Sequence, residues 1–331
     1  MHPFEPRRPL IVRLRNWVGD VTLSLPLLTR LDAAGYDLCL VGKGWARELL
    51  AGHGWPVQVL GKTLGERVVQ LRALRRQALQ DDPAFGRRLN ALCLPDSFSS
   101  ALDFRLAGLR ALGHANEGRS PLLGRAVARP PGQHELAVYW QLGSLLLGSA
   151  AELPTQIGLR LTALQRAQAA ALREQHGLGP RYIVVCPFAG GTWSGQDKTW
   201  PAFPDFVASL AARTRAVNGP PVLICPGPGE EALARECFGT AVVLTGVGLG
   251  AYAALLADAA LMVSNDTGPA HMAAAVGTPL VSVMGPSNPA LWRPWGPNVQ
   301  VLQGGMPGQP EWPTLAAVDS AAQATLALPI G

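Results

Sequence analysis

The sequence is poor in charge and lacks both long apolar runs and closely spaced cysteine pairs. It contains no uninterrupted apolar run of about 18 residues, so no membrane-spanning helix is predicted. The five cysteines include no CxxC pair and no HExxH motif is present, which argues against a catalytic zinc site. Only 15% of the residues are charged and 48% are hydrophobic, a balance typical of a chain that is folded throughout.

The N-terminal segment predicts a cytoplasmic protein. Arginines stand directly beside the strand-like run LIVRLR, whereas a secretory signal would have an apolar core there. Four cysteines, Cys39, Cys93, Cys186 and Cys225, lie in strand-like runs. We expect them to be buried thiols that pack as small hydrophobic side chains.

The net charge of +5 is concentrated around the helix-like segment 66–79. Such a run is typical of a solvated helix face. The alternative is a surface that contacts an anionic substrate or an anionic membrane leaflet. A nucleic-acid partner is not expected, because no aromatic interleaving accompanies the basic residues. The arginines concerned are Arg72, Arg75, Arg76, Arg87 and Arg88.

Short apolar runs that end in Gly, Pro or Asp alternate with helix-like segments along most of the chain. Examples are the runs YDLCLVGKG, RYIVVCPFAGG and PLVSVMGPS and the helix-like segment FPDFVASLAARTRA. This alternation predicts an α/β fold with parallel sheets, in which ligands bind at the carboxyl ends of the strands.

The length favours two domains, because 331 residues exceed what one hydrophobic core usually holds. The alternation of strands and helices fades between about residues 135 and 180. We therefore predict an N-terminal domain at residues 1–150, an interdomain linker at 151–175, and a C-terminal domain at 176–331 that ends in a helix.

The most informative segment is MVSNDTGPAHMAAAVGTPLVSVMGPSNPALWRPWG, which begins at Met262. A buried strand is predicted to end at Ser264, and the helix that follows is predicted to end at Gly277. The turn at Thr267 and Gly268 would direct free backbone N–H groups, at the positive end of the helix dipole, towards a bound diphosphate.

Two polar side chains of this segment each allow two interpretations. A carboxylate beside a diphosphate is unfavourable unless it has another role, so Asp266 either caps the helix or binds sugar hydroxyls. His271, one turn into the helix, either donates a hydrogen bond to phosphate or is a buried histidine with partners of its own.

At these residues the sequence resembles a known family. The segment NDTGPAHMAAAVGTPLVSVMGPSNP is similar to the C-terminal signature of the lipopolysaccharide heptosyltransferases, glycosyltransferase family 9, and RLRNWVGDVTLSLPLL is similar to that family's opening strand and loop. The stretches RNWVGD and LPDSFSSAL resemble the ADP-heptose:LPS heptosyltransferase II type most closely, and the matching blocks extend from about residue 10 to about residue 297. The resemblance implies a GT-B fold, in which two Rossmann-like parallel-sheet domains face each other across a cleft.

The resemblance also implies a reaction. The family transfers heptose from ADP-heptose, held mainly by the C-terminal domain, to a lipid-linked core oligosaccharide on the N-terminal domain. The transfer inverts the anomeric centre and usually needs no metal, in keeping with the lack of a D-x-D pair in this sequence. The lipid-linked acceptor implies weak peripheral contact with the cytoplasmic face of the inner membrane.

Carried over by motif position, Lys198 matches the lysine that precedes the family's Trp-Pro pair, which is Trp200-Pro201 here. A fixed cation there would stabilise the negative charge that the departing nucleoside diphosphate gains. The other donor-binding residues implied by the family are Asp266, Thr267, Gly268 and His271 in the helix segment, Glu230 for the ribose, and Val247 at the spacing of the adenine contact.

The loop before Lys198 is the expected phosphate loop, with Gly190, Gly191, Thr192 and Ser194 as its candidate contacts. This chain departs from the family there, because it has CPFAGGTWSGQ where a PGA-type start is usual. The hydroxyl group that contacts phosphate is therefore left open.

Asp20 matches the aspartate of the family's GD pair and is the candidate general base, because inverting transfer needs a group that takes the proton of the attacking hydroxyl. The alternative is a helix N-cap. Pro26 disfavours that alternative, since a helix starting at Asp20 would carry proline in its interior. The candidate acceptor-binding residues around Asp20 are Arg15, Asn16, Trp17 and Ser97.

The strongest alternative function is an NAD(P)-dependent oxidoreductase. Gly246, Gly248 and Ala251 form a G-x-G-x-x-A turn between a strand and a helix, and Asp266 follows twenty residues after Gly246. A binding protein that keeps the fold without catalysis is a third class, disfavoured because Asp20, Lys198 and Asp266 are all present.

Overall fold

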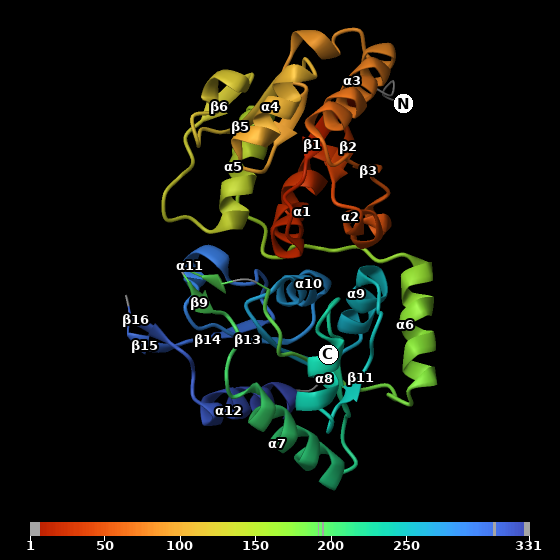
Figure 1. Cartoon of the computed structure of the whole chain (residues 1–331), viewed down its shortest axis with the longest axis vertical. Coiled ribbons are helices and arrows are strands. Elements are labelled where there is room, and N and C mark those ends of the chain that lie inside the picture. Colours follow the sequence, from red (N-terminus) through yellow and green to blue (C-terminus); the bar gives the residue numbers. More distant parts are fainter. Residues whose placement is uncertain (1–6, 191, 194, 307–308, 328–331) are drawn as a thin grey trace. The chain divides into compact units, whose positions relative to one another are not determined.

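The computed structural model describes residues 7–190, 192–193, 195–306 and 309–327. The chain divides into two compact units, Met1–Pro154 and Thr155–Gly331. Each unit contains a six-stranded parallel sheet flanked by helices (Figure 1). The predicted α/β class is therefore confirmed, whereas the separate roles expected for the two domains stay predictions.

The sheet of the first unit has the strand order β3-β2-β1-β4-β5-β6. The order reverses between β1 and β4, and ligands bind at such a reversal, beside the carboxyl ends of the strands. The elements of this unit are β1 (Arg8–Arg13), α1 (Val18–Ala33), β2 (Tyr36–Gly42), α2 (Trp45–Leu49), β3 (Val57–Val59), α3 (Leu64–Asp81), β4 (Ala91–Cys93), α4 (Phe98–Leu106), β5 (Ala111–His114), β6 (Arg125–Val127) and α5 (Glu135–Leu147).

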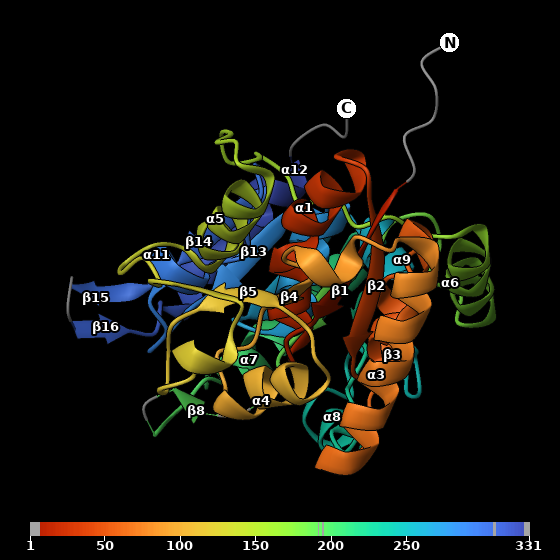
Figure 2. The ribbon, with the colours of Figure 1, turned by 90° about the horizontal axis from the view of Figure 1, so that it is seen from above.

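Helices cover both faces of this sheet (Figure 2). On one face, α3 and α4 pack Leu71 and Phe104 against Ile11 and Ala91 of the central strands. On the other, α1 and α5 lie side by side. Helix α3 begins with a capping box formed by Thr63 and the carboxylate three residues later.

Pro26 lies inside α1, so the argument that proline disfavours a helix in this segment was wrong. The proline ring removes one backbone hydrogen bond of the helix. The neighbouring residues 21–28 are buried, and burial of this apolar face outweighs the loss of one bond.

The second unit repeats the strand order of the first, with β11-β10-β7-β12-β13-β14. Its reversal lies between β7 and β12. The elements are α6 (Ala163–Gln175), β7 (Ile183–Cys186), β8 (Thr192–Trp193), β9 (Gln196–Asp197), α7 (Phe203–Ala216), β10 (Val222–Ile224), α8 (Glu231–Cys237), β11 (Val242–Val243), α9 (Leu249–Ala257), β12 (Leu261–Asn265), α10 (Gly268–Val276), β13 (Leu280–Val283), α11 (Pro289–Trp292), β14 (Val299–Leu302), β15 (Gly304–Met306), β16 (Gln309–Glu311) and α12 (Leu315–Ala327).

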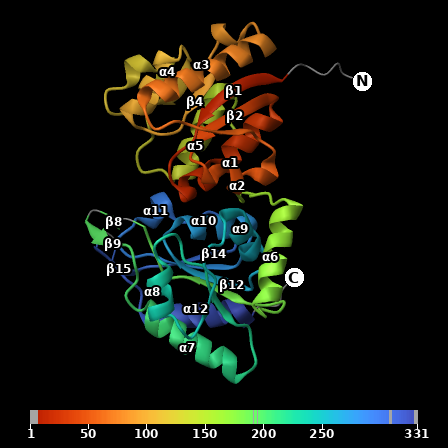
Figure 3. The same cartoon turned by 45° about the vertical axis from the view of Figure 1, so that its right-hand side comes forward.

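Helices also cover both faces of the second sheet (Figure 3). Helices α7 and α12 pack Phe206 and Val318 against Val185 and Val263 on one face. Helices α9 and α10 pack together on the other face, and α6 packs along α9. Part of the segment that was predicted as a linker, 151–175, therefore forms a helix that packs within the second unit.

The close packing of α1 and α5 generates a stability prediction. A Cβ atom at Gly143 would lie 2.5 Å from Leu27 Cδ1, so a larger side chain there must displace α5 or the leucine. Gly143→Val should therefore lower the free energy of unfolding by about 1–3 kcal/mol in urea denaturation. The control is Gly65→Ala in α3, where no atom lies near the added methyl. It should leave stability unchanged or raised, and equal losses in both variants would contradict the packing argument.

Candidate functional site

Asp20 is the third residue of α1. Helix α1 begins at Val18 with Trp17 at the N-cap position, so the interpretation of Asp20 as the cap is wrong. The carboxylate instead accepts a hydrogen bond from the Tyr139 hydroxyl at 3.1 Å, and Arg15 Nε lies 3.7 Å from the same oxygen. Burial raises the pKa of Asp20 above its ordinary value, and the nearby Arg15 opposes that rise.

Asp96, which follows β4, binds three guanidinium groups near Asp20. Its carboxylate lies 3.3 Å from Arg15, 3.0 Å from Arg129 and 3.4 Å from the fully buried Arg119. Carboxylates that pair with several arginines in a half-buried position hold those arginines in fixed geometry.

Glu135, at the start of α5, completes this arrangement with a side chain that is only 1% exposed. It accepts from Arg15 Nη2 at 2.9 Å and also pairs with Arg129. Asp20 therefore belongs to a group of three positive and three negative side chains whose charges offset one another. We call this set the charged cluster: Arg15, Arg119, Arg129, Asp20, Asp96 and Glu135.

Arg15 was predicted as an acceptor ligand, but its three nitrogens already bond within the protein. They donate to Tyr139, Asp96 and Glu135. Burial lowers the pKa of Arg15, but these neighbours and Asp20 outweigh burial and raise it above its ordinary value. Arg15 is therefore a permanently charged support of Asp20.

The other predicted acceptor residues lie near a cavity of about 380 Å³ in the first unit. Asn16 and Ser97 line it, whereas Trp17 is not among its lining residues and is 68% exposed. The cavity lies where β1, β2 and β4 end. Its other lining residues are Arg13, Gly42, Lys43, Leu60, Gly61, Lys62, Arg67, Ser99, Ser100 and Asp103.

Positive charge dominates this cavity. Arg67 donates two hydrogen bonds to Asp103, at 2.7 and 3.1 Å. The negative charge of Asp103 is therefore paired with Arg67. Arg13 Nε is buried and has no hydrogen-bond partner among the described residues, and burial lowers the pKa of Arg13. The charge of Asp103 partly offsets that of Arg13, but the buried Nε without a partner still favours an anion as ligand. Sequence reasoning missed Arg13, although its place as the last residue of a buried strand was a usable signal.

In the second unit, the predicted residues Lys198 and Asp266 meet. Lys198 Nζ lies 3.1 Å from Asp266 Oδ2, and both side chains are largely buried. Thr267, not Asp266, holds the N-cap position of α10, so the cap interpretation of Asp266 is also wrong. Asp266 pairs with Lys198 instead, and its contact with sugar hydroxyls stays a prediction.

Asn265 fixes the segment that carries Lys198. Its Nδ2 donates to the Pro187 carbonyl at 2.6 Å, and its Oδ1 accepts from the Trp200 backbone at 3.0 Å. One side chain at the end of β12 therefore holds both ends of the loop after β7. Trp200 is itself anchored in the core, where its indole donates to the Pro313 carbonyl. Sequence reasoning did not assign Asn265 a role.

Helix α10 begins at Gly268 beside the Lys198–Asp266 pair. Pro269 has no N–H and the His271 N–H donates to the Thr267 carbonyl at 3.4 Å. The N–H groups of Gly268 and Ala270 have no acceptor within the helix, so they are available to an anion. Gly277 ends the helix in the left-handed conformation, as predicted. His271 is buried, with Nε2 3.9 Å from Asp266 Oδ1.

The remaining predicted donor residues follow other strands of the same sheet. Glu230 lies in the turn after β10 and accepts from the Gly227 backbone at 2.7 Å. Val247 is half-buried in the turn between β11 and α9. Gly190 is exposed after β7, and Thr192 lies in the short strand β8. Gly191 and Ser194 lie outside the described residues.

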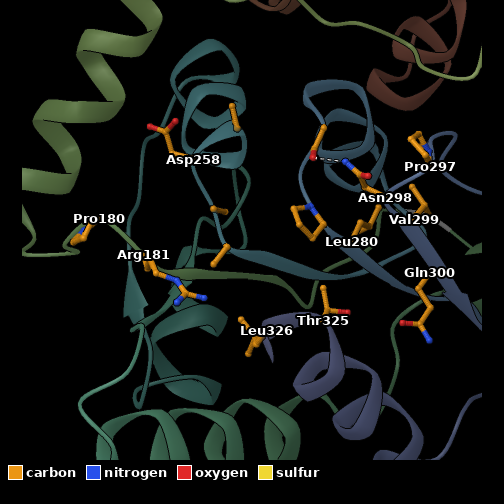
Figure 4. A pocket seen from close by; sticks show the side chains of 15 residues that line it. Pro180, Arg181, Asp258, Leu280, Pro297, Asn298, Val299, Gln300, Thr325 and Leu326 are labelled. Carbon is orange, nitrogen blue, oxygen red and sulfur yellow. Dashed lines mark hydrogen bonds between the residues drawn. The ribbon is translucent and has the colours of Figure 1, made fainter. Parts of the chain in front are cut away.

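A larger cavity, of about 690 Å³, lies in the second unit at the amino ends of the strands, away from Lys198 and Asp266 (Figure 4). Its lining residues Arg181, Asp258, Leu280 and Asn298 stand where β7, β12, β13 and β14 begin. Ligands of parallel α/β sheets bind at the other ends of the strands, so this cavity is not the candidate site.

In the part of the chain that the structure describes, no group of three or more His, Cys, Asp or Glu side chains is placed to hold a metal ion. Within the same part, no helix is long and apolar enough to cross a membrane.

Two parallel six-stranded α/β units with charged residues at the carboxyl ends of their strands are typical of proteins that bind nucleotides. A comparison with protein families agrees, because the model of glycosyltransferase family 9 (heptosyltransferase) matches residues 89–319. The chain belongs to this family.

Curated relatives include lipopolysaccharide heptosyltransferase 2 of Escherichia coli K12, which is 26% identical over 312 residues, 87% of this chain and 86% of the relative. Lipopolysaccharide heptosyltransferase 3 of Escherichia coli is 34% identical over 131 residues, 37% of this chain, and that match spans only 36% of the relative's length.

Solved structures agree on the fold. The ADP-heptose LPS heptosyltransferase II of E. coli has a TM-score of 0.78 at 23% identity, and the match covers 96% of this chain and 98% of that one. The E. coli heptosyltransferase WaaC solved with ADP has a TM-score of 0.67 at 23% identity, and the match covers 96% of this chain and 99% of that one.

The fold class is GT-B, as predicted. The oxidoreductase alternative is not supported: its glycine turn follows the outer strand β11, and Asp266 is paired with Lys198.

The two bonds of Asn265 predict a stability effect. Asn265→Asp keeps the shape but replaces the donor to the Pro187 carbonyl by an acceptor, in a buried position. The free energy of unfolding should fall by about 1–3 kcal/mol. Asn298→Asp is the matched control, because its amide also donates to a carbonyl, that of Gly277, but in an exposed position. A loss at residue 265 no larger than at residue 298 would contradict the role of Asn265 in holding the loop.

Proposed function

We propose that this protein is an inverting heptosyltransferase that transfers heptose from ADP-heptose to the inner core of lipopolysaccharide. The observation that carries the proposal is the Lys198–Asp266 pair beside the N-terminus of α10. The matched heptosyltransferases and the WaaC structure with ADP support the donor class.

In this proposal the second unit binds the donor without a metal ion. The backbone N–H groups at Thr267 and Gly268 receive the diphosphate, and Lys198 supplies the fixed positive charge. Asp266 holds the lysine in place, which gives the carboxylate a role beside phosphate. Glu230 and Val247 are the proposed ribose and adenine contacts, and His271 and the loop residues 190–194 complete the site.

The first unit provides the acceptor site and the base. Asp20 takes the proton of the acceptor hydroxyl as its oxygen bonds to the anomeric carbon. The bond from that carbon to the diphosphate breaks with its electron pair, and ADP leaves beside Lys198. The cavity lined by Arg13, Asn16 and Ser97 is proposed to receive an anionic group of the lipid-linked acceptor.

Contact with the cytoplasmic face of the inner membrane is a further part of the proposal. The basic helix α3 was its main candidate. Two of its arginines have structural roles, since Arg72 and Arg75 donate to the carbonyls of Leu106 and Gly108 at the end of α4. Arg76 and Val69 are exposed on the same helix and are the residues we propose to contact lipid.

Asp20→Asn tests the base directly. The amide keeps the shape but does not take up the proton, so turnover should fall by roughly 10²- to 10⁴-fold. ADP affinity, measured by calorimetry, should not change. Because the folded-state pKa of Asp20 is raised, its ionised form is a net cost to stability above that pKa, and the variant should melt no lower than wild type at neutral pH. Near-normal turnover in Asp20→Asn would refute the assignment.

Lys198→Ala tests the leaving-group contact. Loss of a charge-assisted contact in a partly desolvated site should weaken ADP binding about 10- to 100-fold and lower turnover as well. The control is Arg166→Ala, which removes an exposed charge of α6 in the same unit. If ADP binds Lys198→Ala as tightly as it binds the control, Lys198 does not contact the donor.

A further inference from the structure

The hydroxyl group of Tyr139 stands between Arg15 and Asp20. Arg15 Nε lies 2.9 Å from the phenol oxygen, and that oxygen lies 3.1 Å from Asp20 Oδ1. Arg15 Nε is only a donor, so the phenol oxygen accepts from the guanidinium and gives its single proton to Asp20. The tyrosine is buried, with 1% of its surface exposed.

The same contacts leave one oxygen of Asp20 uncommitted. Tyr139 and Arg15 both approach Oδ1. No described residue forms a hydrogen bond with Oδ2. An acceptor of a substrate proton needs such a free lone pair within reach of the substrate.

Five ionisable groups surround Asp20 from the elements packed against it. Arg15 comes from the β1–α1 connection, and Arg129 lies before α5. Asp96 comes from the segment after β4 and reaches Asp20 through Arg15. Glu135 and Tyr139 come from α5, and among the described residues only Tyr139 donates a hydrogen bond to Asp20.

The proton between Tyr139 and Asp20 stays on the tyrosine. Burial, together with the charge of Asp20, raises the pKa of Tyr139 well above its ordinary value. In the other direction, the hydrogen bond from Tyr139 lowers the pKa of Asp20, against the larger effect of burial. The tyrosine therefore favours the ionised carboxylate, which is the form that accepts a proton.

We propose that Tyr139 is a positioning residue, whose hydroxyl holds Oδ1 of Asp20 so that Oδ2 receives the proton of the acceptor hydroxyl. This inference rests on the proposed function, in which Asp20 is the base. Arg15 is held by Asp96 and Glu135, and its contact polarises the Tyr139 hydroxyl. Tyr139 thus acts through Asp20.

Tyr139→Phe removes the hydroxyl and keeps the ring. Because the ionised form of Asp20 loses a hydrogen bond, the acidic limb of the kcat/KM profile should move to higher pH. At neutral pH, kcat should fall about tenfold while ADP affinity stays unchanged. The control is Tyr182→Phe, which removes a buried hydroxyl that donates to the Leu255 carbonyl at 2.6 Å in the second unit. Its acidic limb should not move.

A double-mutant cycle separates this inference from the proposed function. Adding Tyr139→Phe to Asp20→Asn should cause no further loss of turnover, because the tyrosine acts only through the carboxylate. Normal turnover in Asp20→Asn alone would overturn the base and this inference together. Loss of turnover in Asp20→Asn with an unchanged profile in Tyr139→Phe would overturn the positioning role alone.

A second variant covers the case in which Tyr139→Phe does not fold. Incorporation of 3-fluorotyrosine at position 139 keeps the hydroxyl and makes it a stronger donor. The acidic limb should then move to lower pH. A limb that stays at its wild-type position would overturn the proposal.

Discussion

Both candidate sites depend on the parallel direction of neighbouring strands at the point where the strand order reverses. In each sheet the two central strands, β1 and β4 or β7 and β12, end at the same edge, while the helices that follow them lie on opposite faces. The segments leaving the two strands therefore bring together residues far apart in sequence. Asp20 and Asp96 meet in this way through Arg15, and Lys198 meets Asp266.

Each site also balances a charge that would be unfavourable alone. Asp266 alone would repel a diphosphate, but Lys198 neutralises its charge. The positive end of the α10 dipole then makes the local electrostatic potential positive. Around Asp20, three arginines and three carboxylates offset one another, with Tyr139 between two of them. Removing Asp96 or Glu135 would leave buried arginines without their partner, so these pairs depend on one another. The cavity near Arg13 is the exception, and its excess positive charge is what an anionic acceptor group would neutralise.

The sequence predicted the central strands because they are buried on both faces and form unbroken apolar runs. It missed β3, β5, β6 and β14, which carry weaker apolar patterns, although it did predict the outer strand β11. The motifs identified Lys198 and Asp266 as site residues. Their contact with each other, and the hydrogen bonds of Asn265 to the loop after β7, could not be predicted from the distances between these residues in the sequence. Tyr139 lies more than a hundred positions from Asp20, and nothing in the sequence around it distinguishes it from other residues of a helix. Only the packing of α1 against α5 brings the two together.

The central claim is that this chain transfers heptose from an ADP-linked donor with inversion. The most direct measurement is NMR of the product formed by the purified protein from ADP-heptose and a lipopolysaccharide inner-core acceptor, in excess EDTA, with UDP- and GDP-sugars as competing donors. The account predicts a heptosylated acceptor whose new linkage has the anomeric configuration opposite to that of the donor. A product with retained configuration, transfer only from a UDP- or GDP-sugar, or transfer that needs added divalent metal would contradict it.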